Sequence, residues 1–283
     1  MNEANSTRHG AEHSPLGQAA HYCDTYNPGL LFPIARQLKR DELGILPGRL
    51  PFVGEDLWNA YELSWLNSRG KPVVALGSFR VPADSPCLIE SKSLKLYLNS
   101  LNQSRYPDAA TVEALIRQDL SVAAGAPVAV ALELLDGSPT RRVIAPPPGE
   151  SLDLLDIDVD TYLPCPEFLS TVVGEVREET LHSHLLKSNC LVTGQPDWGC
   201  VVVRYLGAPI DRAGLLRYIC SFRQHNEFHE QCVERVFCDI LARCRPHALA
   251  VWARYTRRGG LDINPFRSTG AFCAPDNISE VRQ

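Results

Sequence analysis

A cysteine and an aspartate on either side of a short polar segment are the first candidates for chemistry in this sequence. Between Cys190 and Asp197, residues 191–196 include a glycine and a proline, which predict a turn. Strands before and after that turn would bring the two side chains to one pocket. A thiolate is a strong nucleophile and a carboxyl group exchanges protons, so the spacing indicates a nucleophile facing a proton donor. A cysteine on a strand is also often no more than a small buried apolar residue.

A second candidate is the polar start of a predicted helix. Glu90 can accept N–H groups of a heterocycle, and it is followed by Ser91, Lys92 and Ser93. The first turn of a helix offers free backbone donors and a favourable dipole, so these residues suit a phosphate group. The alternative is a helix cap followed by solvated lysines.

A third candidate is the run Glu227-Phe228-His229-Glu230 at the start of another predicted helix. Phe228 can stack on a flat heterocycle while Glu230 accepts its N–H donors through charge-assisted bonds. His225 and His229, four residues apart, suit a surface pair or two metal ligands equally well.

A basic, glycine-containing segment follows the last strand that the sequence predicts. No G-x-G-x-x-G motif follows a predicted strand, so a nicotinamide cofactor would need another binding site for its phosphates. Arginine forks match phosphate geometry and glycines allow close backbone approach, which makes this segment a candidate: Arg254, Arg257, Arg258, Gly259 and Gly260.

The strands and helices that must position these residues are predicted to occur in the same order in each half of the chain. Alternating and helical spacing of apolar residues predicts strands over 57–66 and 72–81, helices over 91–102 and 108–124, and a strand over 127–135. The second half predicts strands over 184–193 and 199–206, helices over 211–222 and 226–244, and a strand over 248–256.

This repeat predicts an α+β fold of two units, each with paired helices on one face of an antiparallel sheet. The expected divisions are a polar N-terminal segment at 1–25, a first unit at 26–145, a linker at 146–166 and a second unit at 167–283, which carries Cys190. Such units leave sheet edges to be paired, so we expect oligomers.

Composition limits the function classes. A net charge of -5 opposes nucleic-acid binding, and a hydrophobic content of 45% is ordinary for a globular protein. The polar start has no apolar region typical of a signal peptide, and the longest apolar run, near residues 126–135, is too short for a membrane span. Ten scattered cysteines favour reduced thiols, so we expect a cytoplasmic protein.

The motifs together match one known family. The block Glu-Ser-Lys-Ser-x-Lys-x-Tyr at Glu90–Tyr97 occurs with Cys190 and Asp197, with Phe228–Glu230 and with the stretch Arg257–Pro265. Over nearly its whole length the sequence closely resembles the long, tandem form of the NADPH-dependent 7-cyano-7-deazaguanine reductase family, of the QueF type.

This resemblance implies tandem tunnelling-fold (T-fold) units, dimers of the chain, NADPH as co-substrate and no metal. It implies nitrile reduction in tRNA queuosine biosynthesis, with a thioimidate at Cys190, a proton from Asp197 and two NADPH per product. For Asp197 to donate that proton at neutral pH, we expect a raised pKa. The deazapurine substrate would contact Ile89, Glu90, Ser91, Phe228, His229 and Glu230. NADPH would contact Ser91, Lys92, Arg258 and Gly259.

Two other functions remain open from the sequence. One is a cyclohydrolase-like enzyme in which His182, His184 and Cys190 hold zinc. The other is a non-catalytic module that delivers a deazapurine to a tRNA-modifying partner.

Overall fold

Strands and helices follow the predicted order in a computed structural model that describes residues 22–135 and 143–283. The predicted N-terminal segment at 1–25 lies mostly outside these residues. The described chain divides into two units. Neither unit is one continuous stretch of chain: Leu50–Leu57 belongs to the second unit, and Gly259–Leu261 belongs to the first.

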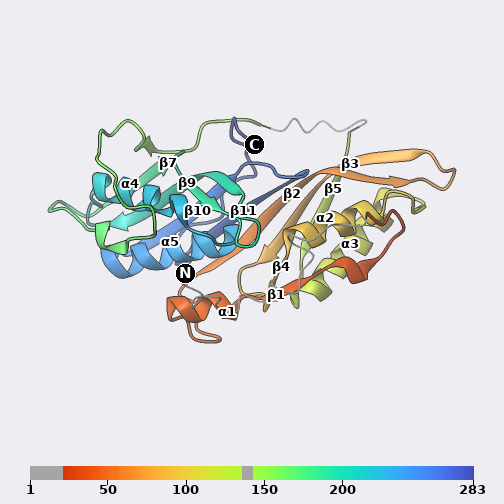
Figure 1. Ribbon diagram of the computed structural model, residues 1–283, viewed down its shortest axis with the longest axis horizontal. Coiled ribbons are helices and arrows are strands. Elements are labelled where there is room, and N and C mark those ends of the chain that lie inside the picture. Colours follow the sequence, from red (N-terminus) through yellow and green to blue (C-terminus); the bar gives the residue numbers. More distant parts are fainter. Residues whose placement is uncertain (1–21, 136–142) are drawn as a thin grey trace, which may run out of the picture. The chain divides into compact units, whose positions relative to one another are not determined.

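The first unit carries a helix pair on an antiparallel sheet in the order β5-β3-β2. Helix α3 begins where the Asp108 side chain accepts a hydrogen bond from the backbone N–H of Thr111 at 2.8 Å, and it ends at Gly125. The elements are β1 (Pro33–Ala35), α1 (Gln37–Arg40), β2 (Val53–Leu66), β3 (Pro72–Pro82), β4 (Cys87–Ile89), α2 (Ser91–Ser100), α3 (Ala109–Ala124) and β5 (Ala129–Leu134), with 3-10 turns at Pro28–Leu30 and Asp41–Leu43 (Figure 1).

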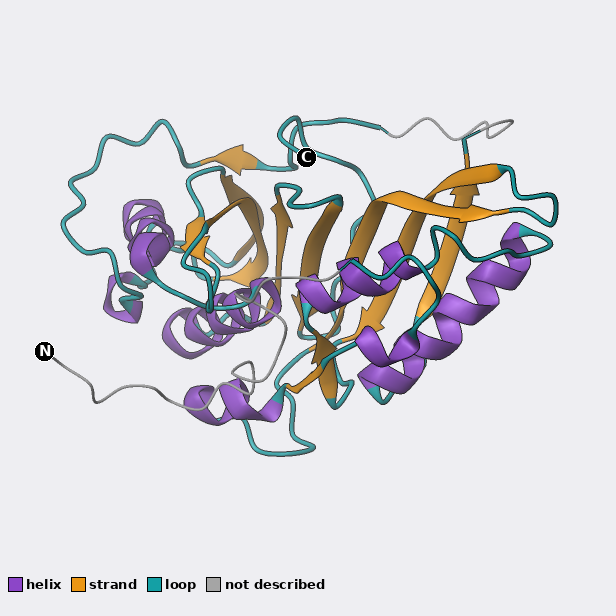
Figure 2. Ribbon diagram, turned by 45° about the vertical axis from the view of Figure 1, so that its right-hand side comes forward, coloured by secondary structure: helices purple, strands orange, loops and turns teal. Residues whose placement is uncertain are grey.

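The second unit has a sheet in the order β11-β10-β9-β7-β6, and short strand β8 also pairs with β9. All these pairings are antiparallel except that of β6 with β7. Figure 2 shows the helix pair of each unit, in purple, against the orange strands of its own sheet. The elements are β6 (Glu150–Ser151), β7 (Arg177–Ser183), β8 (Lys187–Asn189), β9 (Pro196–Gly207), α4 (Arg212–Ser221), α5 (His229–Cys244), β10 (Ala248–Tyr255) and β11 (Leu261–Ser268), with 3-10 turns at Pro166–Phe168 and Phe222–Gln224.

Both units use the same bond to lock their helices together. The Tyr97 hydroxyl of α2 donates to Asp119 of α3 at 2.6 Å, and the Tyr218 hydroxyl of α4 donates to Asp239 of α5 at 2.6 Å. The shared element order and the shared bond agree with the repeat seen in the sequence. The predicted α+β class with antiparallel sheets is confirmed. The predicted division of the chain at 146–166 stays a prediction.

One predicted strand does not form, and strand β11 was not predicted. The expected strand over 184–193 does not form, because the chain leaves β7 at Ser183, turns, and pairs again only over β8. Strand β11 was missed although Leu261, Asp262, Ile263 and Asn264 alternate between apolar and polar residues, because Pro265 within the run argues against a strand.

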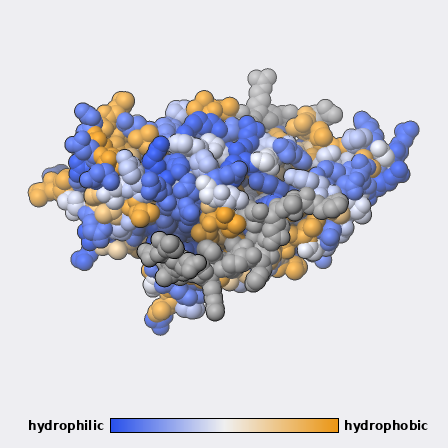
Figure 3. All heavy atoms as spheres, viewed as in Figure 1, coloured by the Kyte–Doolittle hydropathy of each residue, from blue (hydrophilic) through white to orange (hydrophobic). Residues whose placement is uncertain are grey.

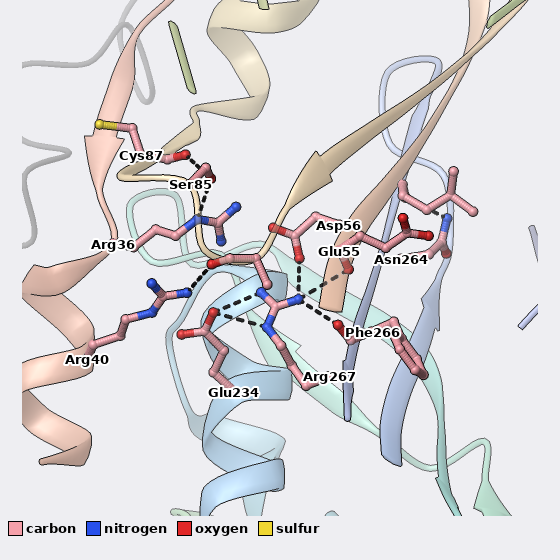
Figure 4. A network of polar contacts seen from close by, with 12 residues as sticks. Arg36, Arg40, Glu55, Asp56, Ser85, Cys87, Glu234, Asn264, Phe266 and Arg267 are labelled. Carbon is pink, nitrogen blue, oxygen red and sulfur yellow. Dashed lines mark hydrogen bonds and ion pairs between the residues drawn. The ribbon is translucent and has the colours of Figure 1, made fainter. Parts of the chain in front are cut away.

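The polar residues of β11 are buried because they are paired inside the second unit. The Arg267 guanidinium donates to Asp56 at 2.8 Å and to Glu234 of α5 at 2.8 Å, and its side chain is 0% exposed (Figure 4). It also donates to the backbone carbonyls of Glu55 and Phe266. Arg267 therefore joins α5 to the sheet through charge pairs.

On the face that Figure 3 shows, hydrophilic and hydrophobic residues are interspersed. Among residues 22–135 and 143–283, no helix combines the length and the apolar character that crossing a bilayer requires.

Candidate active site

Cys190 lies at the start of a tight turn between β8 and β9, not on a strand as predicted. Its backbone N–H donates to the carbonyl of Gln195 at 2.8 Å, and its carbonyl accepts from Gly194 at 3.0 Å. Gly194 has a φ of 66°, a left-handed conformation that favours glycine. Ser188 pairs with Asp197 across the ribbon. Cys190 lies opposite Gln195, two residues beyond the Ser188–Asp197 pair. The side chains of Cys190 and Asp197 are therefore diagonal neighbours on the same face of the ribbon. Both side chains belong to residues that are at least nine-tenths buried.

Asp197 is held by two groups of the same unit. Oδ1 lies 3.4 Å from Nε2 of His229 and accepts a hydrogen bond from Arg258. The His229 ring stacks on Tyr255, with ring centroids 3.8 Å apart and planes 3° from parallel. Arg258 also donates to the side chain of Gln195, so one guanidinium holds two residues on the β9 side of the turn.

The predicted rise in the pKa of Asp197 is wrong for this structure. Burial raises the pKa, but the hydrogen bond and charge of His229, together with Arg258, outweigh burial and hold the pKa below its ordinary value. At neutral pH Asp197 is therefore a carboxylate.

A buried charge network braces the chain before Cys190. The Glu227 carboxylate accepts from both nitrogen arms of Arg235, at 2.7 and 3.1 Å, and lies 2.9 Å from Nε2 of His225. The backbone of Asn189 bonds to His225 and Glu227 at 2.8 and 3.1 Å. The network therefore fastens the loop at 225–228 to the residue that precedes Cys190.

The network predicts acid sensitivity. Although burial raises the pKa of Glu227, its bonds to His225 and Arg235 lower it from 4.5 to about 2. A depressed folded-state pKa contributes stability above pH 4.5 that is lost as pH falls toward 2, on the order of 3 kcal/mol. Glu227→Gln should therefore be less stable than wild type at pH 7, with the difference shrinking over that range in urea unfolding at several pH values.

The exposed Glu178, which pairs with Arg204, supplies the control. Glu178→Gln should change stability by less than about 1 kcal/mol. A constant gap between wild type and Glu227→Gln from pH 7 to pH 3 would contradict the role of the network.

The third sequence candidate lies beside the turn in the same unit. Phe228 is the residue before α5, its ring nearly buried, and its backbone N–H donates to the Gln231 side chain at 3.3 Å. His229 opens the helix, and Glu230 is 2% exposed. The predicted helix begins three residues later than expected, because residues 225–228 are extended along β8.

The Glu90 segment belongs to the other unit and forms the helix cap that was the alternative prediction. Glu90 accepts hydrogen bonds from the backbone N–H groups of Lys92 and Ser93 at 2.6 and 2.8 Å. The donors predicted to be free for phosphate are therefore occupied. Burial raises the pKa of Glu90 despite these bonds. Ile89 ends β4 and is buried, while Ser91 is partly exposed at the first position of α2.

The predicted basic cluster is divided. Arg254 donates a hydrogen bond to the carbonyl of Asp276 at 2.6 Å, and Arg258 donates a hydrogen bond to Asp197. Gly259 belongs to the first unit, with a φ of 56°, where it lines a cavity of about 250 Å³ together with Gly260 and Lys95.

The zinc ligands of the cyclohydrolase alternative do not come together. Within the described part of the chain, the one group of three or more His, Cys and acidic residues close enough for a metal is His184, Cys200 and Glu280. Nδ1 of His182 instead lies 3.0 Å from the carbonyl oxygen of Pro148.

Two residues of this arrangement, Tyr255 and Arg235, escaped the sequence analysis. Tyr255 gives no signal, because every residue of β10 is buried. Arg235 is visible as a charge opposite to that of Glu227, two helical turns away and close to the apolar face of a predicted helix, and that position is the signal that would have found it.

A buried thiol beside a carboxylate held by an imidazole and a guanidinium is an arrangement found in thiol-dependent enzymes. The family model described as nitrile reductase, 7-cyano-7-deazaguanine-reductase N-term, matches residues 22–132, and that of QueF-like protein matches residues 196–272. A protein of Aromatoleum aromaticum named NADPH-dependent 7-cyano-7-deazaguanine reductase is 69% identical over 284 residues and 100% of both chains. Proteins of the same name from Azoarcus sp. (strain BH72) and Dechloromonas aromatica are each 68% identical, over 100% and 95% of both chains. The chain belongs to the QueF nitrile reductase family.

Proposed function

We propose that this protein reduces the nitrile of 7-cyano-7-deazaguanine to a primary amine with NADPH, in queuosine biosynthesis. The observation that carries the proposal is the turn that presents Cys190 as a diagonal neighbour of Asp197. The names of full-length relatives at 68–69% identity support the substrate and cofactor.

The Asp197 carboxylate accepts the thiol proton of Cys190 as sulfur bonds to the nitrile carbon, and the same proton passes to the nitrile nitrogen. One C–N π bond breaks and one S–C bond forms, which gives a thioimidate. Because the thiol supplies the proton, Asp197 needs no raised pKa in the resting protein. His229 and Arg258 keep the carboxylate oriented while the proton is in transit.

When bound, NADPH supplies hydride. Two hydrides and two protons convert the thioimidate to the amine and release Cys190, so two NADPH are oxidised per product. Within this proposal Phe228, His229 and Glu230 contact the heterocycle, and the family resemblance adds Ile89, Glu90 and Ser91 as further candidates. The buried carboxylates of Glu90 and Glu230 suit the N–H groups of a deazapurine.

For the cofactor we propose contacts with Ser91, Lys92, Arg258 and Gly259. The cavity beside Gly259 supports this, since Lys95 lies against Gly259 there and offers a positive charge, although Glu62 also lines the cavity. A volume of about 250 Å³ suits one end of a dinucleotide and not its whole length.

We also propose a domain architecture, an oligomeric state and a cellular location for this protein. The two units are tandem T-folds divided near 146–166, and the chain works as a cytoplasmic homodimer without nucleic acid. The shared Tyr–Asp bonds of the two helix pairs support the tandem arrangement.

Purified protein mixed with 7-cyano-7-deazaguanine and NADPH tests the reaction. We expect substrate-dependent loss of NADPH absorbance with two NADPH oxidised per amine formed. Tight binding of the heterocycle by folded protein, with no NADPH consumption, would favour the delivery module instead.

A further inference from the structure

A histidine, a cysteine and a glutamate outside the proposed active site converge in the second unit. One nitrogen of His184, Sγ of Cys200 and one carboxylate oxygen of Glu280 all lie within 4.8 Å of one another. They come from the turn after β7, from the middle of β9 and from the C-terminal segment. We propose that His184, Cys200 and Glu280 bind a zinc ion that fastens the C-terminal segment to the sheet.

The geometry suits a small tetrahedral cation. Nδ1 of His184 and Oε2 of Glu280 are 3.3 Å apart. Two ligands at the Zn–N and Zn–O distances of about 2.0–2.1 Å, separated by a tetrahedral angle, lie about 3.3 Å apart. An imidazole, a thiolate and a carboxylate are the ligand types that zinc accepts. The His184 side chain is 34% exposed, so water can take a fourth position.

An unpartnered buried oxygen points to a ligand. Glu280 is 5% exposed, and its Oε1 is buried with no hydrogen-bond partner among the described residues. A buried carboxylate oxygen without a partner is unfavourable, and a cation removes that penalty.

The charges around the three ligands are balanced by a dication. The Asp153 carboxylate accepts from the backbone N–H of His184 at 3.0 Å, and the Arg282 guanidinium donates to the carbonyls of His184 and Gly199. These two charges offset each other. Glu280 and a Cys200 thiolate then carry two negative charges, which match Zn²⁺.

The C-terminal segment is held in place by other bonds, so the ligands are positioned before an ion binds. The backbone of Ser279 pairs with Val143 and Ala145 at 3.0 Å, and the Gln283 side chain donates to the carbonyl of Tyr255 at 3.0 Å. Preorganised ligands lower the conformational entropy lost on binding.

The site is separate from the proposed reaction. Side chains alternate along a strand, so Cys200 and Asp197, three residues apart on β9, point to opposite faces of the sheet. Cys200 packs with Val202, Ala250 and Trp252 on the face away from Asp197. The ion would stabilise the fold without touching the substrate.

The competing arrangement is metal-free. Burial and the Glu280 carboxylate raise the pKa of Cys200, so without a cation the thiol stays protonated beside a His184–Glu280 contact. Binding of Zn²⁺ or Co²⁺ would displace that proton to solvent.

Cobalt titration of the full chain, first stripped with a chelator, distinguishes the two arrangements. We expect one Co²⁺ per chain, tetrahedral d–d bands and a thiolate-to-cobalt charge-transfer band, with Zn²⁺ displacing the cobalt and raising the Tm. Cys200→Ser, nearly equal in size, should lose the charge-transfer band. Glu280→Gln should weaken binding by at least about tenfold.

Two controls assign the band to this site. Cys244→Ala changes another buried cysteine, and Cys190→Ala removes the proposed nucleophile; both variants should keep the band. Circular dichroism establishes that each variant is folded. No band in folded wild type, or a band that survives Cys200→Ser, would overturn the zinc site. Chelation should leave NADPH oxidation unchanged, so the result is independent of the proposed function.

Discussion

Cys190→Ala should lower nitrile reduction by at least about 1,000-fold while heterocycle binding and the fold persist. Alanine cannot form the S–C bond, and the residual pocket can still hold the substrate. Two readouts check this: NADPH oxidation, and the protein mass after incubation with substrate but no NADPH. Wild type should gain the mass of one substrate, and the variant should gain none.

Cys244→Ala is the matched control, because Cys244 is also buried and its sulfur lies 3.8 Å from the carbonyl oxygen of Ser170, away from Cys190. It should keep wild-type turnover. A substrate adduct that persists in Cys190→Ala would move the nucleophile to another cysteine.

Asp197→Asn separates the nucleophile from the proton transfer. The amide keeps the size of the side chain but cannot accept the thiol proton, so thioimidate formation should slow by roughly 100-fold or more. The final adduct mass should be unchanged. Formation of the adduct at the wild-type rate would mean that another group moves the proton.

The second large effect concerns stability. Arg267→Met should lower the free energy of unfolding by about 3–5 kcal/mol, because it leaves the carboxylates of Asp56 and Glu234 buried without their guanidinium. Methionine fills most of the volume of the arginine stem, so the loss reports the charges more than a cavity. Urea unfolding followed by circular dichroism measures it.

Arg204→Met is the same substitution at an exposed pair. Arg204 and Glu178 are 43% and 49% exposed, so the expected change is less than about 1 kcal/mol. Equal losses in the two variants would show that burial of the Arg267 pairs contributes nothing.

Local spacing was enough to predict the four long helices α2 to α5 but not the short helix α1. The predicted helices at 91–102 and 108–124 became Ser91–Ser100 and Ala109–Ala124, because apolar periodicity and an Asp108 cap are properties of neighbouring residues. The motif residues likewise identified the family before any contact was known. The repeat of strand, strand, helix, helix and strand was also visible in the sequence.

Tertiary structure alone decided the electrostatics. The proton-donor role implied by the family resemblance called for a raised pKa at Asp197, but His229 and Arg258, 32 and 61 residues away along the chain, lower it. Burial of Arg267 in β11 and the meeting of His184, Cys200 and Glu280 likewise depend on segments distant in sequence. Charge and ligand interactions act through space over a few ångströms, whereas periodicity records only neighbours along the chain. The sequence therefore determined which residues are available for chemistry, and the fold decided which charges face them.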